Sequence, residues 1–188
     1  MDLQLKGRLV SVIGADQGTQ AACRRVLEGE GAVIAAAPSE LSYPLADIVI
    51  AVGGVRPGSD LLEVSDPDDL YAAWDDMTDA VSAYRAALPR MLENKWGRFV
   101  WVGSAQAKSV DAEADELAAM TSLGMLGLNK VITGEVGSNG ITANAVLRGG
   151  IATDEDVANA VTFLCSEGAA YLSGITITVD GGIGSGIF

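Results

Sequence analysis

Short apolar runs rich in β-branched residues alternate along the chain with longer amphipathic stretches. The first run, Arg8–Ile13, ends at Gly14. It is followed by Gly18–Glu30, in which apolar residues recur at helical spacing on one face. A strand, a glycine turn and a helix in this order are typical of the start of a dinucleotide-binding fold.

Five further apolar runs predict strands that are buried on both faces. They lie at Gly31–Ala37, Asp47–Val52, Arg98–Val102, Thr142–Val146 and Ile175–Val179. The stretches between them predict helices at 67–94, 112–136 and 154–166. Alternating strands and helices indicate the α/β class, with a Rossmann-like, doubly wound parallel sheet. The length of 188 residues fits a single domain, 1–188.

The connection from Pro38 to Ala46 is short for this fold. An extended chain of this length can cross back along a strand, but a complete helix–strand–helix unit needs about 30 residues or more. We therefore expect the sheet to lack one edge strand and its helix. The loss would leave the core intact and would expose the edge of the second strand.

The net charge of −13 argues against nucleic acid and anionic membranes as partners, because both attract basic surfaces. A basic protein partner remains compatible with this charge. No apolar run reaches the roughly 18 residues that a membrane span needs, and residues 1–10 lack the apolar core of a signal peptide. We expect a cytoplasmic protein.

Cysteine and histidine usage limits the chemistry that the chain can perform. Cys23 and Cys165 are far apart in the sequence and form no C-x-x-C motif, so we expect two buried, unpaired thiols. Histidine is absent, which removes Ser-His and Cys-His nucleophilic catalysis and the commonest transition-metal ligand. We predict no metal site.

Several motifs together resemble the short-chain dehydrogenase/reductase family over nearly the whole chain. They are Gly14-x-x-x-Gly18, Asp47–Gly54, Gly97–Ser104, Ile141–Gly149 and Tyr171–Gly182. The resemblance implies an NAD(P)-dependent oxidoreductase fold. It also implies a catalytic serine at the end of a strand, followed by a helix that carries Tyr-x-x-x-Lys.

The catalytic tyrosine and lysine of that family are missing from this chain. Ser104 stands at the serine position, but the helix has Ala118 at the tyrosine and Ser122 at the lysine. A register shifted by one residue gives Leu117 and Thr121 instead. None of the four tyrosines is followed by a lysine four residues later. A lone serine cannot act as an acid or base at neutral pH, so we predict no catalytic residue.

Two more features of the family are altered. The position of its fourth catalytic residue, an asparagine, is occupied by Asp76. After the fifth strand, Arg148–Thr153 runs almost directly into Asp154, at the start of the last helix. The resemblance therefore implies that the substrate lid is missing.

The cofactor motif also departs from the family pattern. Gln20 replaces its last glycine, and Asp16 introduces a carboxylate near the expected diphosphate. The residues after the second strand are Ala37 and Pro38, where the family has an acidic or basic residue for the ribose. The turn Ala51–Gly54 lacks both family asparagines. We predict that Gly14 and Gly18 only pack the strand against the helix, and that this chain binds no cofactor.

The elements through which the family assembles are kept, although the chemistry is lost. These are the long helices on either side of Gly97–Ser104, and the last helix with the last strand. The helix at 112–136 has small residues that permit close helix approach, and the tail Gly181–Phe188 is apolar or small. The acidic segment Asp60–Asp79 contains no basic residue and suits either solvent or a basic partner surface.

The leading hypothesis is a non-catalytic subunit of a heteromeric NAD(P)-dependent alcohol or hydroxyacyl-CoA dehydrogenase. It would form a hetero-oligomer, expected to be a heterotetramer, with an intact homologue that binds NAD. The resemblance extends to heteromeric family members of the kind used in anaerobic toluene degradation. One alternative is a stand-alone regulatory protein that senses a nucleotide through Gly14 and Gly18. Another is an active enzyme that uses Asp76 and Ser104.

Overall fold

The computed structural model describes residues 2–36, 43–54, 67–108 and 116–184. Within these residues, six strands form one parallel sheet in the order β2-β1-β3-β4-β5-β6. The strands are β1 (Leu9–Gly14), β2 (Val33–Ile34), β3 (Ile48–Val52), β4 (Gly97–Ser104), β5 (Ile141–Arg148) and β6 (Thr176–Val179). The predicted doubly wound α/β sheet is confirmed.

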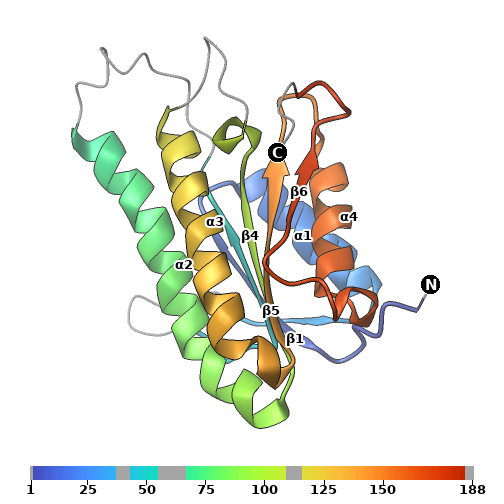
Figure 1. Cartoon of the computed structure of the whole chain (residues 1–188). Coiled ribbons are helices and arrows are strands. Elements are labelled where there is room, and N and C mark those ends of the chain that lie inside the picture. Colours follow the sequence, from blue (N-terminus) through green and yellow to red (C-terminus); the bar gives the residue numbers. More distant parts are fainter. Residues whose placement is uncertain (1, 37–42, 55–66, 109–115, 185–188) are drawn as a thin grey trace.

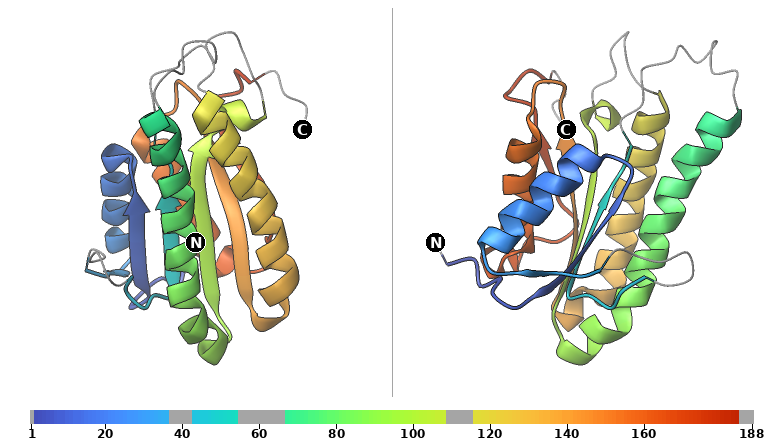
Figure 2. Two further views of the ribbon diagram at one scale, coloured as in Figure 1. Left: turned by 90° about the vertical axis from the view of Figure 1, so that its left-hand side faces the viewer. Right: turned by 180° about the vertical axis from the view of Figure 1, so that it is seen from behind.

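The helices cover both faces of the sheet (Figures 1 and 2). They are α1 (Gln17–Gly29), α2 (Pro67–Asn94), α3 (Glu116–Val136) and α4 (Asp154–Cys165). Three short 3-10 helices follow strands or helices: η1 (Ala105–Ala107), η2 (Gly137–Asn139) and η3 (Glu167–Ala169). Helices α2 and α3 lie on one face, and α1 and α4 lie side by side on the other (Figure 1).

Alternate residues of the strands fill the two halves of the core, as the strand period of two requires. On the side of α1 and α4, Ile48, Ile50 and Val52 pack with the buried Cys23 and Cys165. Both thiols are free and buried, as predicted. Tyr84, Phe99 and Trp101 are among the buried residues on the side of α2 and α3.

Strand β2 is shorter than the predicted strand Gly31–Ala37. Only Val33 and Ile34 pair with β1, and Ala37 lies outside the described residues. Strand β2 is an edge of the sheet, and Val33 is half exposed. A strand with a neighbour on one side only is held by fewer hydrogen bonds, which explains the shorter pairing.

Strand β3 is tied to the end of α2 by Asp47. Its carboxylate accepts hydrogen bonds from Arg90 Nε (2.7 Å) and from the Leu9 N–H (3.0 Å). Partial burial alone would raise the pKa of Asp47, but these donors outweigh it and hold the pKa below its usual value.

The helices among the described residues were compared with the length and hydropathy that a membrane span requires, and none of them meets both.

The Asp47 interaction predicts a loss of stability in acid. A carboxyl whose pKa is lower in the folded state contributes stability above its unfolded pKa of about 3.9, and this is lost as the pH falls through the lower, folded value. The free energy of unfolding, measured in urea between neutral pH and about pH 2, should therefore fall more steeply in the wild type than in Asp47→Asn. Equal slopes for the two proteins would contradict this role for Asp47.

Candidate functional site

The carboxyl ends of the parallel strands meet at one edge of the sheet, at the top of Figure 1. In open α/β sheets this edge is where ligands bind. The turn after β1, Ser104 at the end of β4 and Arg148 at the end of β5 all lie along it. These three points make up the candidate site.

Ser104 is held by its neighbours in the described structure. Its hydroxyl accepts a hydrogen bond from the Gln106 N–H (3.2 Å) and caps η1, while also donating to Gln106 Oε1 (3.3 Å). Its backbone N–H donates to Ser122 Oγ (2.9 Å). Ser104 and Ser122, predicted at the family's serine and lysine positions, are thus brought together by α3 and β4.

The position predicted for the tyrosine is occupied by Ala118, which is buried in α3. In the register shifted by one residue, Leu117 and Thr121 are also buried, and Thr121 Oγ1 donates to the Leu117 carbonyl (2.9 Å). In neither register does the helix place a phenol or an amine at these two positions. The hydroxyl groups of serine and threonine do not titrate near neutral pH, so they are poor proton-transfer groups.

Asp76, at the position of the fourth catalytic residue, bonds to backbone. Its carboxylate accepts from the Gly54 N–H (2.9 Å), just after β3. This contact ties α2 to the turn that follows the strand. Asp76 and Ser104 thus each have a local partner of their own.

The turn between β1 and α1 is built around Gly14. Gly14 has a positive φ of 122°, and a Cβ there would collide with the Val52 carbonyl group of β3. Gln20 is buried, and its side-chain amide donates to the Gly14 carbonyl (2.7 Å). The residue that replaces the family's last glycine therefore fits the turn and supports it.

Asp16 is the N-cap of α1. Its carboxylate accepts hydrogen bonds from the N–H groups of Gly18 (3.0 Å) and Thr19 (3.3 Å). An N-cap carboxylate satisfies free N–H groups of the first turn and interacts favourably with the helix dipole. The sequence interpretation took Asp16 only as a repulsive charge and missed this role, although an Asp before a helix start was a usable signal.

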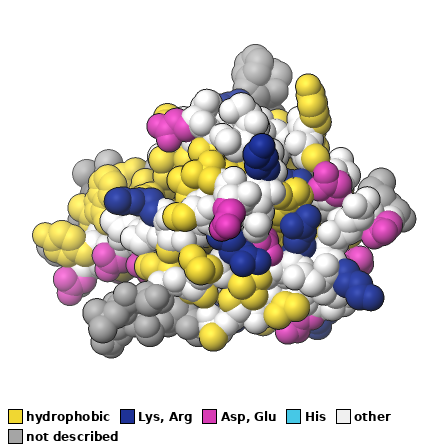
Figure 3. Space-filling model, turned by 90° about the horizontal axis from the view of Figure 1, so that it is seen from below, with side chains coloured by type: hydrophobic (Ala, Val, Ile, Leu, Met, Phe, Trp, Pro, Cys, Tyr) yellow, Lys and Arg dark blue, Asp and Glu magenta, His cyan; other side chains and the backbone are white. Residues whose placement is uncertain are grey.

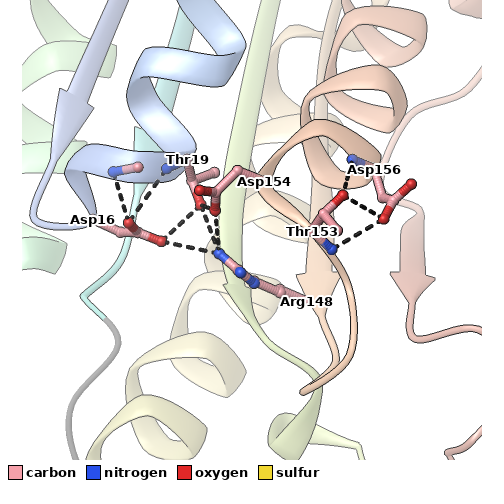
Figure 4. A network of polar contacts seen from close by, with 7 residues as sticks. Asp16, Thr19, Arg148, Thr153, Asp154 and Asp156 are labelled. Atoms are coloured by element: carbon pink, nitrogen blue, oxygen red, sulfur yellow. Dashed lines mark hydrogen bonds and ion pairs between the residues drawn. The ribbon is translucent and has the colours of Figure 1, made fainter.

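Arg148 connects Asp16 to the start of α4 (Figure 4). Its Nη1 lies 2.5 Å from Asp154 Oδ1, 3.0 Å from Thr19 Oγ1 and 3.4 Å from Asp16 Oδ2. Thr19 Oγ1 in turn lies within hydrogen-bonding distance of both carboxylates. We call these four residues the Arg148 network.

The Arg148 network was not predicted from the sequence. It joins residues separated by more than 120 positions, and only the sheet topology brings them together. Its N–H, hydroxyl and guanidinium groups are donors that bind anionic oxygens. In this structure they hold the chain's own carboxylate oxygens, those of Asp16 and Asp154.

Parts of three other predicted features lie outside the described residues. Ala37 and Pro38 lie outside the described residues, as do 60–66 of the acidic segment and 185–188 of the tail. Gly181–Gly184 is exposed on the chain. Among the described residues, no group of three or more His, Cys, Asp or Glu side chains could hold a metal ion.

Comparisons with known proteins show similarity to reductases. No family model matches the chain. The 3-oxoacyl-(acyl-carrier-protein) reductase FabG of Pseudomonas aeruginosa is 30% identical over 215 aligned residues, covering 94% of this chain and 85% of the relative. The FabG of Escherichia coli is 29% identical over 167 residues, covering 73% of this chain and 66% of the relative.

Solved structures share the fold. A short-chain dehydrogenase/reductase of Serratia marcescens has a TM-score of 0.82 at 21% identity and covers 95% of this chain and 98% of its own. The L-sorbose reductase of Gluconobacter frateurii, complexed with NADPH and L-sorbose, has a TM-score of 0.83 at 20% identity, with 97% and 98% covered.

The prediction that this chain binds no cofactor is contradicted by these comparisons. A protein with the same fold over 97% of this chain is complexed with NADPH, and the curated relatives are reductases. The prediction relied on the charge of Asp16, on Gln20, on Ala37 and Pro38, and on the turn Ala51–Gly54. In the structure, Arg148 and the N–H groups of α1 bind the Asp16 carboxylate, and Gln20 supports the glycine turn.

The close approach at Gly14 predicts a large effect of one methyl group. Gly14→Ala should lower the free energy of unfolding by at least about 3 kcal/mol, because the new Cβ meets backbone and the φ is unfavourable for alanine. Gly29→Ala is the matched control, since a Cβ at Gly29 meets nothing within 4 Å. It should be neutral or stabilise α1 by up to about 1 kcal/mol. Urea unfolding measures both, and similar losses would contradict the role of the turn.

Proposed function

Because this chain belongs to the short-chain dehydrogenase/reductase family, we propose that it is a non-catalytic subunit of a heteromeric NAD(P)-dependent dehydrogenase. It would support the assembly or stability of an intact homologue that performs the reaction on an alcohol or hydroxyacyl-CoA. The observation that carries the proposal is the filling of the tyrosine and lysine positions by the buried Ala118 and Ser122. Ser122 is also engaged by the backbone of β4.

An exposed apolar surface on α2 and α3 supports assembly. On α3, Met120, Leu123 and Val131 are exposed, and a Cβ at Gly127 or Gly134 would meet nothing within 4 Å. These five residues recur every three or four positions, so they fall on one face of the helix. Open space over two of them permits the close approach of another helix.

Helix α2 extends this surface. Leu70, Tyr71 and Trp74 are exposed near its start, and α2 packs beside α3. Seen from below, hydrophobic side chains reach the edge of the molecule that α2 forms (Figure 3). Exposed apolar side chains grouped in this way are typical of protein–protein interfaces. We call the exposed apolar residues of α2 and α3 the helical face.

The proposal includes a nicotinamide dinucleotide bound by this chain. It is supported by the NADPH complex of the L-sorbose reductase, which has the same fold. The donors at the expected diphosphate position are the Gly18 and Thr19 N–H groups and Arg148, which in this structure bind the carboxylates of Asp16 and Asp154. A dinucleotide would supply hydride transfer in a catalytic subunit.

A stand-alone nucleotide-binding regulator is the alternative function. The same hydrogen-bond donors would serve this function. However, a stand-alone regulator would not explain why the helical face is exposed. The two functions differ in oligomeric state: the regulator would remain separate from intact homologues.

Co-expression with an intact homologue from the same genome, one that carries Tyr-x-x-x-Lys, should yield a stable mixed oligomer. Size-exclusion chromatography and native mass spectrometry detect it. The purified chain alone should not oxidise a panel of alcohols with NAD⁺ or NADP⁺. Turnover that Ser104→Ala abolishes would overturn the non-catalytic assignment.

The helical face predicts which substitutions break the oligomer. Leu123→Asp places a charge at the centre of the proposed contact and should abolish the mixed oligomer, because an unpaired charge in an apolar interface is costly. Leu45→Asp is the matched control, since Leu45 is 57% exposed and Leu123 is 60% exposed. Native mass spectrometry should show assembly for the control only. Loss of assembly in both variants, or in neither, would refute the helical face as the contact.

A further inference from the structure

The exposed side of α3 has the same spacing when it is followed in either direction. Its exposed apolar and small residues lie at intervals of three, four, four and three positions: Met120, Leu123, Gly127, Val131 and Gly134. This spacing is symmetric about Gly127. If a second copy of α3 is laid on the first in the opposite direction, with the two Gly127 residues level, each position meets its mirror position. The stripe therefore has the symmetry that a two-fold contact requires.

The residues that meet in this arrangement also complement each other in size. Leu123 of each copy lies opposite Val131 of the other, which pairs two exposed aliphatic side chains. Met120 lies opposite Gly134, where a Cβ would meet nothing within 4 Å, so the longest side chain faces the most open position. The same open space at Gly127 lets the two helices approach closely at the axis. In a parallel arrangement Met120 would instead face Met120, and two glycines would face each other.

The charges on α2 favour the same direction. Asp75 and Asp79 are exposed in its first half, whereas Arg85 is exposed in its second half and forms no ion pair within the described residues. Helices α2 and α3 run side by side in the same direction (Figure 1). An antiparallel copy therefore places the acidic half of α2 against the half that carries Arg85, whereas a parallel copy places like charges together.

Exposed aromatic residues add to this contact. Tyr71 and Trp74 precede the acidic residues on α2 and are 64% and 47% exposed. Aromatic residues are enriched at protein–protein interfaces, and an arginine is attracted to an aromatic ring. The antiparallel arrangement brings Arg85 of one copy toward this aromatic half of the other copy.

We propose that the helical face binds a second copy of this chain, antiparallel, with the two-fold axis at Gly127. Leu123 of each copy then packs on Val131 of the other, and the purified chain is a homodimer. In the expected heterotetramer this contact joins the two copies of this chain. The inference rests on the helical face being an assembly surface, as in the proposed function, and it names the partner.

Sedimentation velocity of the purified full chain tests the contact. The wild type should be dimeric at about 10 μM. Leu123→Lys and Val131→Glu should each weaken dimerisation at least about tenfold, because each variant places an unpaired charge in both halves of the symmetric contact. Leu45→Lys is the matched control, since Leu45 is 57% exposed, as is Val131, and lies outside the helical face. It should leave the dimer unchanged.

Combining the two charges tests the axis. When the Leu123→Lys and Val131→Glu proteins are mixed, the introduced lysine faces the introduced glutamate in one half of the contact, and Leu123 faces Val131 in the other. The mixture should therefore form a dimer with one subunit of each kind, which native mass spectrometry detects. The double variant should also recover the dimer, because both halves then hold an opposite-charge pair. In a parallel contact position 123 would face position 123, so the double variant would stay monomeric.

Circular dichroism and thermal unfolding check that each variant is folded, as expected for substitutions at exposed positions. A wild type that is monomeric at about 100 μM would refute the contact between copies. A dimer that survives both single variants would refute the helical face as its surface. Single variants that stay monomeric when mixed, together with a monomeric double variant, would refute the axis at Gly127. Co-expression with an intact homologue tests the proposed function separately, because a chain that is monomeric alone can still form the mixed oligomer.

Discussion

The parallel direction of all six strands is the constraint on which the candidate site depends. It brings the ends of β1, β4 and β5 to one edge, so that Asp16, Ser104 and Arg148 lie along it although they are far apart in sequence. Parallel strands also need helices on both faces, because the central strands are buried on both sides. The same topology therefore builds the core, aims the N-termini of α1 and α4 at this edge and leaves α2 and α3 with an outer face.

Two helix N-termini directed at one place favour negative charge, and the chain meets this with its own carboxylates. Asp16 caps α1, while Asp154 opens α4 and lies against Gly18. Arg148 pairs with both carboxylates, and its positive charge offsets the repulsion between them. The chain has a net charge of −13, so an arginine at this point does not reflect a surplus of basic residues. It meets the local need to neutralise two carboxylates.

The sequence predicted the fold well because the central strands are buried. Ile48–Val52 is a continuous apolar run, the strand Ile141–Arg148 is mostly apolar, and glycines mark the turns, so both the elements and their order were visible. The short β2 was less predictable, since an edge strand depends on a single neighbour. In the site, the missing phenol and amine were evident from residue identity. The Arg148 network was not, because its contacts join residues more than 120 positions apart.

The residues at the tyrosine and lysine positions, Ala118 and Ser122, belong to the packed interior and not to the surface. Trp101 fills the space between β4 and the helices, and a Cβ on Gly53 would lie 2.7 Å from its ring. Its indole nitrogen is buried, with no hydrogen-bond partner among the described residues, a cost of about 1–3 kcal/mol that the packing must offset. Ser122 packs against Gly103 beside the same indole. A lysine at position 122 would need room that Trp101 and β4 occupy, so restoring the family's chemistry requires several coordinated substitutions.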